Sequence, residues 1–449
     1  MASGAALWWA EWAYAGRVAA DVLIETAGGR IVRLVPESGR PPAGAERLRG
    51  LTLPGFANAH SHAFHRALRG RTHARGGDFW TWREAMYGVA AGLDPERYLA
   101  LARATYAEMA LAGITAVGEF HYLHHQKDGR PYADPNAMGR ALVEAAAAAG
   151  VRLTLLDACY LHGGIDGRPL AGAQLRFGDG SADGWAARVE AMGPGDGVRW
   201  MTGAAIHSVR AVDPAAMTAV ASWARVRGVP LHLHLAEQPL ETRECRAATG
   251  RTPAELVAAC GVLGPRTTCV HATHVTPSDI VELGRSGSTI CVCPTTERDL
   301  ADGIGPADRL LAAGSRLCTG SDGQAVIDPF EEARAIELDL RLASGRRGVL
   351  GPAALLDAAT ASGAAGLGWD AGELAPGRLA DWCTIGLDSP RLAGWAPAHG
   401  LGGAIFAATA ADVARVVVGG ETIVRDGRHL RLGDVAAALR AALRLAETG

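Results

Sequence analysis

The chain lacks the features that mark several classes of protein. Its N-terminus has no positively charged leader followed by a long apolar run, and no uninterrupted apolar stretch is long enough to cross a bilayer. The formal net charge of −3 gives no overall field for nucleic acid or an anionic membrane. Eight cysteines in 449 residues do not suggest a disulfide scaffold. We therefore expect a cytoplasmic protein that binds no nucleic acid and no membrane.

What the chain does contain is the composition of a globular enzyme. Hydrophobic residues make up 49% of it and charged residues 20%, and the mean hydropathy is +0.08. A length of 449 residues exceeds one ordinary domain, but a large barrel with an appended domain would fit. The composition predicts a large buried core, and it leaves room for a local basic pocket that binds an acidic small molecule.

The order of strand-like and helix-like segments predicts three zones. Residues 1–53 alternate short β-like runs with Gly/Pro turns. Residues 54–372 alternate apolar strand-like runs with Ala-rich helical stretches, which indicates parallel strand–helix units and, over this length, a barrel. Residues 373–449 return to β character before a final amphipathic helix. The predicted fold is α/β: a (β/α)8 TIM-like barrel, with a small β-sandwich domain built from both chain ends.

Histidines recur where the predicted strands end. In PGFANAHSHAFHR, His60 and His62 alternate along a strand, so both imidazoles point to one side. Two nitrogens placed in this way make half of a zinc-type site, although the pattern alone is weak evidence. In PLHLHLAEQ, His234 lies nearer the carboxyl end of its strand. We therefore favour His234 as a ligand and expect His232 to pack or to support the site.

Two further strand exits extend this pattern. His271 follows an apolar run in CVHATH, and Asp322 ends the run RLCTGSDG. A carboxylate at a strand exit usually caps the next helix, which is the structural alternative for Asp322. Side chains at four such exits meet on one face only if the fold is a barrel. Their joint occurrence favours a metal site over four unrelated structural residues.

This order of motifs resembles the amidohydrolase superfamily over nearly the whole chain. The resemblance implies that one divalent ion, zinc or iron, is held by His60, His62, His234 and Asp322. The segment VRLTLLDACY offers no lysine for a carboxylated-lysine bridge, which points to one ion and not two. An ion held by neutral imidazoles and a carboxylate lowers the pKa of its water from about 15.7 toward about 7.

Three residues are then expected to carry the reaction. Asp322 suits the base that takes a proton from the attacking water, and His271 is placed to orient that water. Glu237 follows His234 in an HxxE pair that resembles the deaminase branch of the superfamily, where the glutamate transfers a proton to the leaving nitrogen. The alternative for Glu237 is an ordinary surface carboxylate.

Longer segments, among them FHRALRGRTHARGGDFWTWREAMYG, resemble the N-formimino-L-glutamate deiminase family. The resemblance implies hydrolysis of the formimino C=N bond in histidine degradation, with release of ammonia and N-formyl-L-glutamate. This small-molecule substrate carries two carboxylates, which arginine binds bidentately. The residues that match the family's substrate contacts are Arg83, Tyr122, His207 and Arg210. Without the resemblance, a structural role would explain Arg83 or Tyr122 about equally well.

Two positions depart from the family pattern. His65 stands in HAFHR where relatives have glutamine, and Gln324 stands in GSDGQ where relatives have histidine. His65 can still donate to a carboxylate, with an altered pH dependence. We expect these changes to bear on the substrate fit and not on the hydrolase chemistry.

Two other functions remain as alternatives. The first is an aminohydrolase of a purine, a pterin or a related ring, which would need aromatic stacking where this chain gathers arginines. The second is a barrel scaffold that has lost catalysis, although such proteins generally lose metal ligands. Cys291 and Cys293 alternate in STICVCP without a second Cys/His pair, so packing in a buried strand is preferred over metal binding. The tryptophan-rich N-terminus predicts a homodimer interface.

Overall fold

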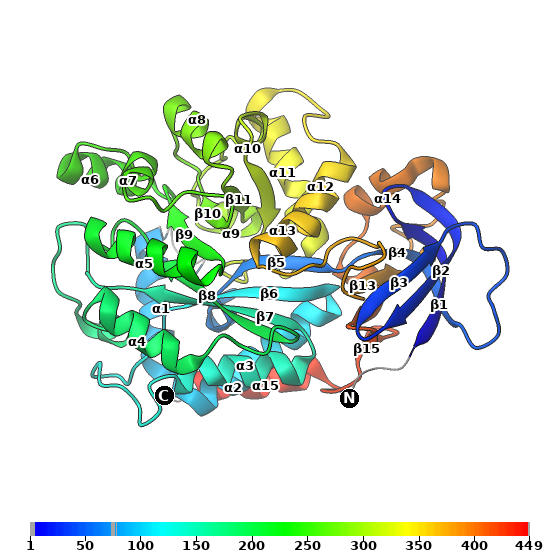
Figure 1. The fold of residues 1–449 in the computed structure, drawn as a ribbon, viewed down its shortest axis with the longest axis horizontal. Coiled ribbons are helices and arrows are strands. Elements are labelled where there is room, and N and C mark those ends of the chain that lie inside the picture. Colours follow the sequence, from blue (N-terminus) through cyan, green and yellow to red (C-terminus); the bar gives the residue numbers. More distant parts are fainter. Residues whose placement is uncertain (1–4, 73–76, 78, 448–449) are drawn as a thin grey trace.

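A computed structural model describes residues 5–72, 77 and 79–447, which form a parallel barrel beside a mixed sheet (Figure 1). Hydrogen bonds join the barrel strands in chain order, and every pairing between them is parallel. The barrel strands are β5 (Phe56–Ser61), β6 (Ile114–His121), β7 (Arg152–Cys159), β8 (Trp200–Ile206), β9 (Leu231–Leu235), β10 (Thr267–His271), β11 (Thr289–Val292) and β12 (Arg316–Thr319).

Helices connect these strands and cover the outside of the barrel (Figure 1). In chain order they are α1 (Phe79–Gly92), α2 (Pro95–Leu111), α3 (Ala137–Ala149), α4 (Ala182–Met192), α5 (Pro214–Arg227), α6 (Pro239–Thr249), α7 (Pro253–Ala259), α8 (Pro277–Ser286), α9 (Pro294–Asp299), α10 (Ala307–Ala312), α11 (Pro329–Ser344), α12 (Pro352–Ala359) and α13 (Ala361–Gly366). None of the described helices combines the length and the apolar character that a membrane span requires.

Local sequence signals fix where many of these helices begin. Asp213 and Asp328 cap α5 and α11 by accepting hydrogen bonds from backbone N–H groups of the first turn. A proline follows each cap at the first helical position, where a missing N–H costs nothing. Thr276 and Asp279 form a reciprocal capping box at α8. Because these helices start at defined residues, the loops that leave the barrel strands have defined lengths.

The two ends of the chain build one mixed sheet beside the barrel, in the order β16-β15-β14-β13-β4-β1-β2-β3. Its strands are β1 (Ala6–Tyr14), β2 (Val18–Ala27), β3 (Arg30–Val35), β4 (Glu46–Pro54), β13 (Trp382–Ile385), β14 (Val413–Val418), β15 (Glu421–Arg425) and β16 (Arg428–His429). β4 pairs with β13, so the N-terminal and C-terminal zones meet in the middle of the sheet. The predicted barrel with a β-domain from both ends is confirmed.

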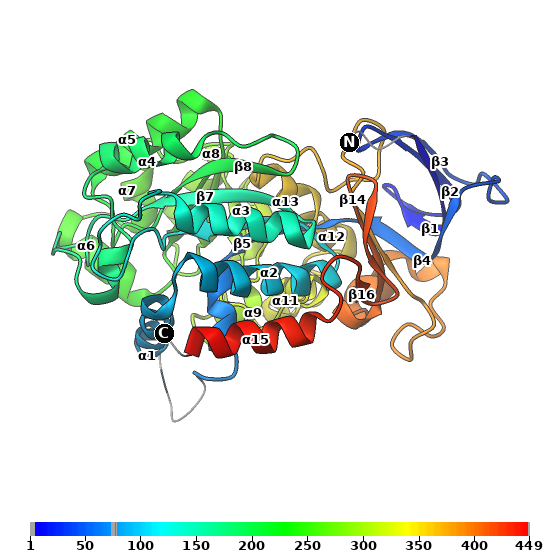
Figure 2. The ribbon, with the colours of Figure 1, turned by 90° about the horizontal axis from the view of Figure 1, so that it is seen from below.

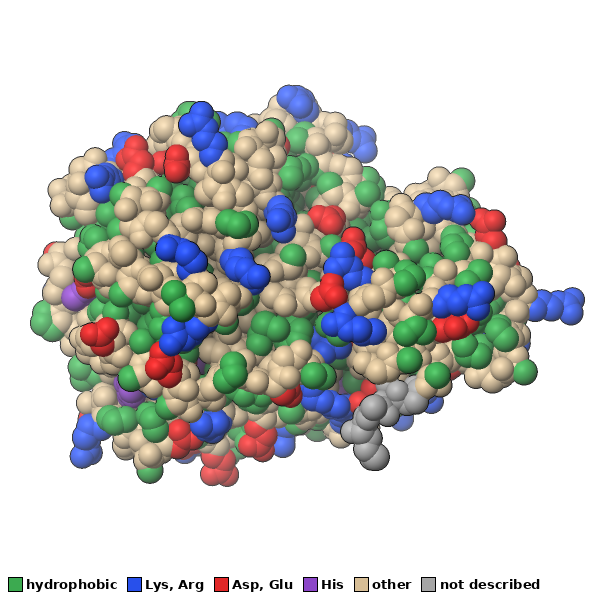
Figure 3. Space-filling view, in the orientation of Figure 1, with side chains coloured by type: hydrophobic (Ala, Val, Ile, Leu, Met, Phe, Trp, Pro, Cys, Tyr) green, Lys and Arg blue, Asp and Glu red, His purple; other side chains and the backbone are tan. Residues whose placement is uncertain are grey.

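The terminal helix α15 (Val435–Glu447) packs against α2 of the barrel and also contacts α1 (Figure 2). Between β13 and β14 the chain forms α14 (Gly400–Ala407). On the visible face of the molecule, basic and acidic side chains are interspersed (Figure 3). This face therefore presents no broad surface of one charge.

The barrel closes where its first and last strands meet. Asp322 N–H donates to His60 O over 3.0 Å, and His62 N–H donates to Asp322 O over 3.2 Å. Gly320 makes this approach possible, because a Cβ at that position would lie 2.7 Å from His60 O and 2.8 Å from His60 Cβ. A side chain at residue 320 would therefore push the two strands apart.

Candidate metal centre and active site

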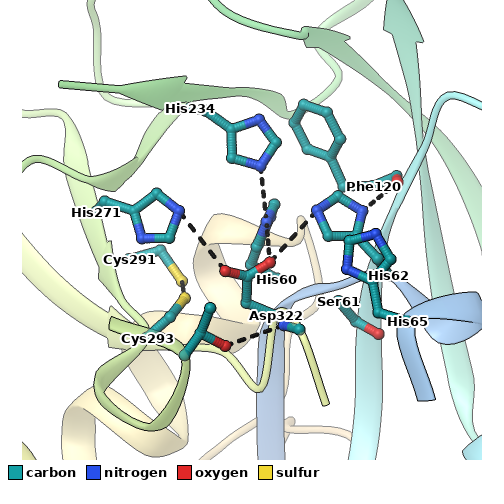
Figure 4. A network of polar contacts seen from close by, with 12 residues as sticks. His60, Ser61, His62, His65, Phe120, His234, His271, Cys291, Cys293 and Asp322 are labelled. Carbon is teal, nitrogen blue, oxygen red and sulfur yellow. Dashed lines mark hydrogen bonds and ion pairs between the residues drawn. The ribbon is translucent and has the colours of Figure 1, made fainter. Parts of the chain in front are cut away.

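Four predicted ligands converge at the carboxyl end of the barrel (Figure 4). His60 lies on β5, His62 directly follows it, His234 lies on β9, and Asp322 follows β12. One possible ligand atom from each lies within 4.8 Å of the others, and all four residues are buried. His60 Nε2 is 3.1 Å from His234 Nε2 and 3.3 Å from Asp322 Oδ1. The geometry thus groups three imidazoles around one carboxylate.

The hydrogen bonds behind these histidines fix which nitrogen faces the centre. His62 Nδ1–H donates to Phe120 O, and His234 Nδ1–H donates to His207 O, each over 2.9 Å. In the neutral rings, Nε2 therefore carries a lone pair that points into the group. Burial lowers the pKa of His62 and of His234 well below its usual value, so both rings are neutral at pH 7.

These residues fit a divalent cation. Two imidazole Nε2 atoms that face each other over 3.1 Å, as in His60 and His234, repel through their lone pairs unless a proton or a cation lies between them. Burial alone would raise the pKa of Asp322, but its contact with His60 and the positive charge of His271 outweigh burial and hold that pKa low. Asp322 is therefore an anion, and a set of nitrogens with one carboxylate oxygen suits zinc or iron.

Backbone strain is concentrated around this group. Residues in the left-handed region, which non-glycine residues rarely adopt, include Ala236 at φ +50°, His271 at φ +71°, Asp322 at φ +39° and Gln324 at φ +59°. Each lies at the exit of a barrel strand. Such conformations cost roughly 1–3 kcal/mol and persist only where the surroundings impose them. The strand exits therefore adopt unfavourable backbone conformations, which set the directions of their side chains.

His271 lies among three carboxylates. Its Nδ1 is 3.2 Å from Glu297 Oε1, and its Nε2 is 3.7 Å from Glu237 Oε1 and 3.6 Å from Asp322 Oδ2. Burial lowers the pKa of His271, but the Glu237 charge and the hydrogen bond to Glu297 outweigh it and raise that pKa to about 10. Glu297 also accepts from the Cys293 N–H over 2.9 Å, which fixes its position. Sequence reasoning missed Glu297, although it lies in the segment CPTTERDL.

Gln324 supports the four predicted metal ligands through hydrogen bonds, and it does not line the cavity. Its Nε2 donates to Ser61 Oγ over 2.9 Å and to Asp322 O over 3.0 Å, and its side chain is fully buried. Ser61 Oγ in turn donates to Glu119 Oε2 over 2.9 Å, and the Ala63 N–H donates to Glu119 Oε1 over 2.7 Å. Gln324 therefore joins the first and last strand exits. This contact gives the departure from the family pattern a structural role in place of a substrate contact.

One cavity gathers the other predicted site residues. It is lined by His62, His65, Arg83, Tyr122, His207, Arg210, His234, Glu237 and Asp322, together with aromatic rings that include Phe79, Trp82, Tyr87 and Tyr160. His60 and His271 complete the group beneath it, each almost fully buried. The cavity thus joins a metal group to two arginines.

The contacts within the cavity differ from residue to residue. The Arg83 guanidinium lies over the rings of Trp80 and Tyr87, at 5.1 and 5.3 Å from their centroids. His65 Nε2 lies 2.9 Å from Tyr122 Oη, and burial lowers the pKa of His65 to about 3. His65 is therefore neutral in the free protein at pH 7. His207 Nδ1 lies 3.2 Å from Ser208 Oγ.

Other histidines and cysteines lie apart from the cavity lining. His232 Nε2 donates to Gly366 O over 3.0 Å, which agrees with a packing role. His121 and His124 form a separate buried group with Asp157. Cys291 and Cys293 fill the barrel interior below the metal group, with their sulfurs 3.9 Å apart. All eight cysteines lie in the described part of the chain, and all are free thiols.

A parallel barrel with three histidines and an aspartate at its carboxyl end is the architecture of a metal-dependent hydrolase. The chain belongs to the amidohydrolase family, whose model matches residues 51–423. This family is metal-dependent, and the His/Asp group supplies the donors that such dependence needs. The predicted family and enzyme class, a hydrolase of C–N bonds, are confirmed.

Similar proteins extend over nearly the whole chain. The formimidoylglutamate deiminase of Pseudomonas aeruginosa is 40% identical over 415 residues, which cover 90% of this chain and 91% of that protein. The 8-oxoguanine deaminase of the same species is 32% identical over 89% of this chain and 88% of its own length.

Solved structures share the same fold. An amidohydrolase from Brucella melitensis has a TM-score of 0.90 at 32% identity and covers 98% of this chain and 100% of its own. An adenosine deaminase from Xanthomonas campestris with bound zinc has a TM-score of 0.84 at 23% identity, with 98% of each chain covered. The second likeness concerns the fold alone.

Proposed function

We propose that this chain hydrolyses N-formimino-L-glutamate to N-formyl-L-glutamate and ammonia. The observation that carries the proposal is the presence of Arg83 and Arg210 in the cavity that contains the metal group. Two guanidinium groups match the two carboxylates of this substrate. The 40% identity to a formimidoylglutamate deiminase over 90% of the chain supports the same substrate.

The proposed chemistry depends on the positions of three residues besides the histidine ligands. When bound by the three histidines and Asp322, a divalent ion, which we propose to be zinc, would supply a Lewis acid that lowers the pKa of water. Asp322 is placed to accept a proton from the attacking water, and His271, 3.6 Å away, is placed to orient that water. Glu237 lines the cavity and can carry protons to the substrate.

The atoms balance without any further reactant. The oxygen of water bonds to the formimino carbon, and both of its protons end on the imino nitrogen. Asp322 is placed to pass on the proton that it takes from water, and Glu237 is placed to carry the other, because both carboxylates line the cavity. Protonation is needed because ammonia leaves far more readily than an amide anion. The C–N bond then breaks, and the formyl product remains.

A ring aminohydrolase is the second candidate. The cavity does contain aromatic side chains, and the 8-oxoguanine deaminase relative has 32% identity. However, the rings of Trp80 and Tyr87 pack against the guanidinium of Arg83. We infer that these two rings hold Arg83 in position to bind an anion and do not stack on a substrate ring. The two arginines in the cavity lining therefore favour the linear substrate with two carboxylates.

An ammonia-release assay tests the proposal directly. We expect release from N-formimino-L-glutamate and at most a trace from guanine, adenosine and cytosine at equal concentrations. Activity confined to a ring substrate would refute the assignment. Absence of activity on all of these substrates by metal-loaded protein would favour the scaffold alternative.

Removal of the metal ion should abolish this activity and lower the melting temperature. An ion that binds only the folded chain stabilises it by about 4 kcal/mol when its free concentration exceeds Kd by about 1,000-fold. Dialysis against a chelator, elemental analysis and differential scanning calorimetry measure the effect, and zinc added back should restore activity at one ion per chain. Full activity in chelated protein with almost no bound metal would contradict the prediction.

Arg83→Met should raise KM for N-formimino-L-glutamate by about 10- to 100-fold, because a charge-assisted hydrogen bond contributes about 1.5–3 kcal/mol. Arg83→Lys serves as the matched control, since it keeps the charge without the bidentate geometry and should give an intermediate KM. Steady-state kinetics measure both variants. An unchanged KM in Arg83→Met would show that Arg83 does not bind the carboxylate.

A further inference from the structure

Two tyrosine hydroxyls of the cavity are bound by the same side-chain amide. Gln174 Nε2 donates to Tyr87 Oη over 3.2 Å and to Tyr160 Oη over 3.1 Å. Tyr87 belongs to α1, Tyr160 directly follows β7, and Gln174 belongs to the short 3-10 helix η2 (Gly172–Arg176). Both tyrosines line the cavity, whereas Gln174 is buried and does not line it. The amide therefore joins two segments of the cavity wall that are far apart in the sequence.

The helix η2 that carries Gln174 is held firmly against its neighbours. Arg176 is almost fully buried, and its guanidinium donates to His125 O over 2.8 Å and to Leu93 O over 2.6 Å. The carbonyl of Arg176 accepts from the His125 N–H over 2.9 Å, and the Phe177 N–H donates to Gln174 O over 2.9 Å. Leu93 directly follows α1, so η2 is fixed against the helix that supplies one of the two tyrosines.

The hydrogens of this group leave one donor over. An amide nitrogen donates and does not accept, so each phenol oxygen is an acceptor toward Gln174. Each phenol carries one hydrogen of its own, and at most one of these two hydrogens can lie between the two phenol oxygens. Neither hydroxyl has a carboxylate or carbonyl acceptor among the described residues. At least one O–H group is therefore available to a ligand.

This donor lies beside an arginine of the cavity. The Arg83 guanidinium is 5.3 Å from the ring centroid of Tyr87, and a guanidinium only donates, so it cannot accept the phenol hydrogen. Burial raises the pKa of Tyr87, and the neighbouring Tyr160 adds to this rise against the charge of Arg83, so Tyr87 keeps its hydrogen at pH 7. A carboxylate bound bidentately by one guanidinium still has lone pairs for another donor.

We propose that Tyr87 and Tyr160 complete the subsite in which Arg83 binds a substrate carboxylate, with a phenol O–H donating to that carboxylate. Gln174 is the positioning residue: by donating to both phenol oxygens, it leaves a phenol hydrogen to the ligand. This inference rests on the proposed function and adds two binding residues and one positioning residue to it. The tyrosines then contribute hydroxyl groups to recognition of the substrate, and not only aromatic rings.

Gln174→Glu and Gln174→Met separate this role from a purely structural one. Glutamate keeps the size of glutamine, but it accepts a phenol hydrogen whether or not it is ionised, so it takes the donor from the substrate. Methionine removes the hydrogen bonds without accepting any. We expect KM for N-formimino-L-glutamate to rise about threefold in Gln174→Met and about 10- to 100-fold in Gln174→Glu, with little change in kcat. A purely structural role predicts the opposite order, because glutamate keeps its contacts with the tyrosines.

Tyr87→Phe and Tyr160→Phe test the donor itself. Phenylalanine keeps the ring and removes the hydroxyl, so a role in stacking predicts no change, whereas we expect at least one variant to raise KM about tenfold. Tyr132→Phe is the matched control, because its hydroxyl accepts from Arg176 Nη2 over 3.3 Å and lies outside the cavity lining. Its KM should not change. Circular dichroism and elemental analysis establish that each variant is folded and metal-loaded.

Binding of glutarate gives a second measurement that needs no turnover. Glutarate carries two carboxylates and no formimino group, and calorimetry should show its Kd rising in the same order as KM. An unchanged KM in both Phe variants would overturn the inference, as would a Gln174→Glu protein that binds glutarate as well as the unchanged protein does. Failure of the proposed function is a separate result, since it would appear as no turnover of N-formimino-L-glutamate by the unchanged, metal-loaded protein.

Discussion

Glu237→Gln should lower kcat for N-formimino-L-glutamate by about 10³-fold and leave the bound metal unchanged. Proton transfer by a positioned side chain contributes about 10²- to 10⁴-fold, and an amide cannot perform it. Glu237 is not part of the group that His60, His62, His234 and Asp322 form, so the substitution removes no predicted ligand. Glutamine keeps the size of the side chain and can still accept a hydrogen bond from Arg210.

Steady-state kinetics, together with elemental analysis, separate loss of chemistry from loss of the ion. Glu282→Gln offers a matched control, because Glu282 is an exposed residue of α8. We expect the control to keep both its activity and its metal. A Glu237→Gln protein that retains kcat within about tenfold would mean that another group transfers the proton.

Arg188→Leu should lower the free energy of unfolding by about 3–5 kcal/mol, because it leaves buried carboxylates without their partner. Arg188 donates to Asp157 over 2.7 and 2.8 Å and to Asp179 over 2.8 and 2.9 Å. All three side chains are almost fully buried. Asp157 belongs to the same buried group as His121 and His124, near the carboxyl ends of β6 and β7. Loss of the Arg188 side chain should therefore loosen the loop that follows Tyr122.

Urea unfolding measures this loss, and an exposed ion pair supplies the control. Arg140 pairs with Asp134 at 2.6 Å, with 50% and 43% of the side chains exposed. Arg140→Leu should therefore change the free energy of unfolding by less than about 1 kcal/mol. Equal losses in the two variants would show that burial of the Arg188 group does not matter for stability.

The effect of Arg188→Leu should also depend on pH. Burial alone would raise the pKa of Asp179, but hydrogen bonds from His125 and Arg188 outweigh it and hold that pKa well below its usual value. A carboxyl whose pKa is lowered by folding contributes its full stabilisation at pH values above its pKa in the unfolded chain, which is about 4. This stabilisation is lost progressively as the pH falls from about 4 toward the pKa of the folded protein. The difference between the variant and the unchanged protein should therefore be larger at pH 7 than at pH 3.5.

The sequence predicted those features that depend on position along a strand. His60 and His62 alternate, and His271 ends an apolar run, so the period of a β-strand and the closure of a barrel are enough to bring them together. Arg83 and Arg210 were different: spacing alone could not place them in one cavity, and resemblance to a family was needed. In the structure, both line the same cavity as Glu237.

The supporting carboxylates could not be predicted in this way. Glu119, Glu241 and Glu297 act through contacts with backbone or side-chain groups near the strand exits. A lone glutamate in a sequence carries no sign of such a contact, because its partner is set by the three-dimensional approach of loops. The same holds for α15: an amphipathic pattern predicts a buried face, but only the structure shows that α2 covers it.

The seam between β5 and β12 has a consequence for how the protein matures. His60 and Asp322 lie at the first and the last barrel strands, and the backbone of Asp322 is joined there to His60 and to His62 by one hydrogen bond each. During synthesis on the ribosome, the early histidines emerge long before the aspartate that completes the group. A nascent chain cannot offer the full donor set until its last barrel strand has left the exit tunnel. The complete donor set therefore forms only when the barrel closes.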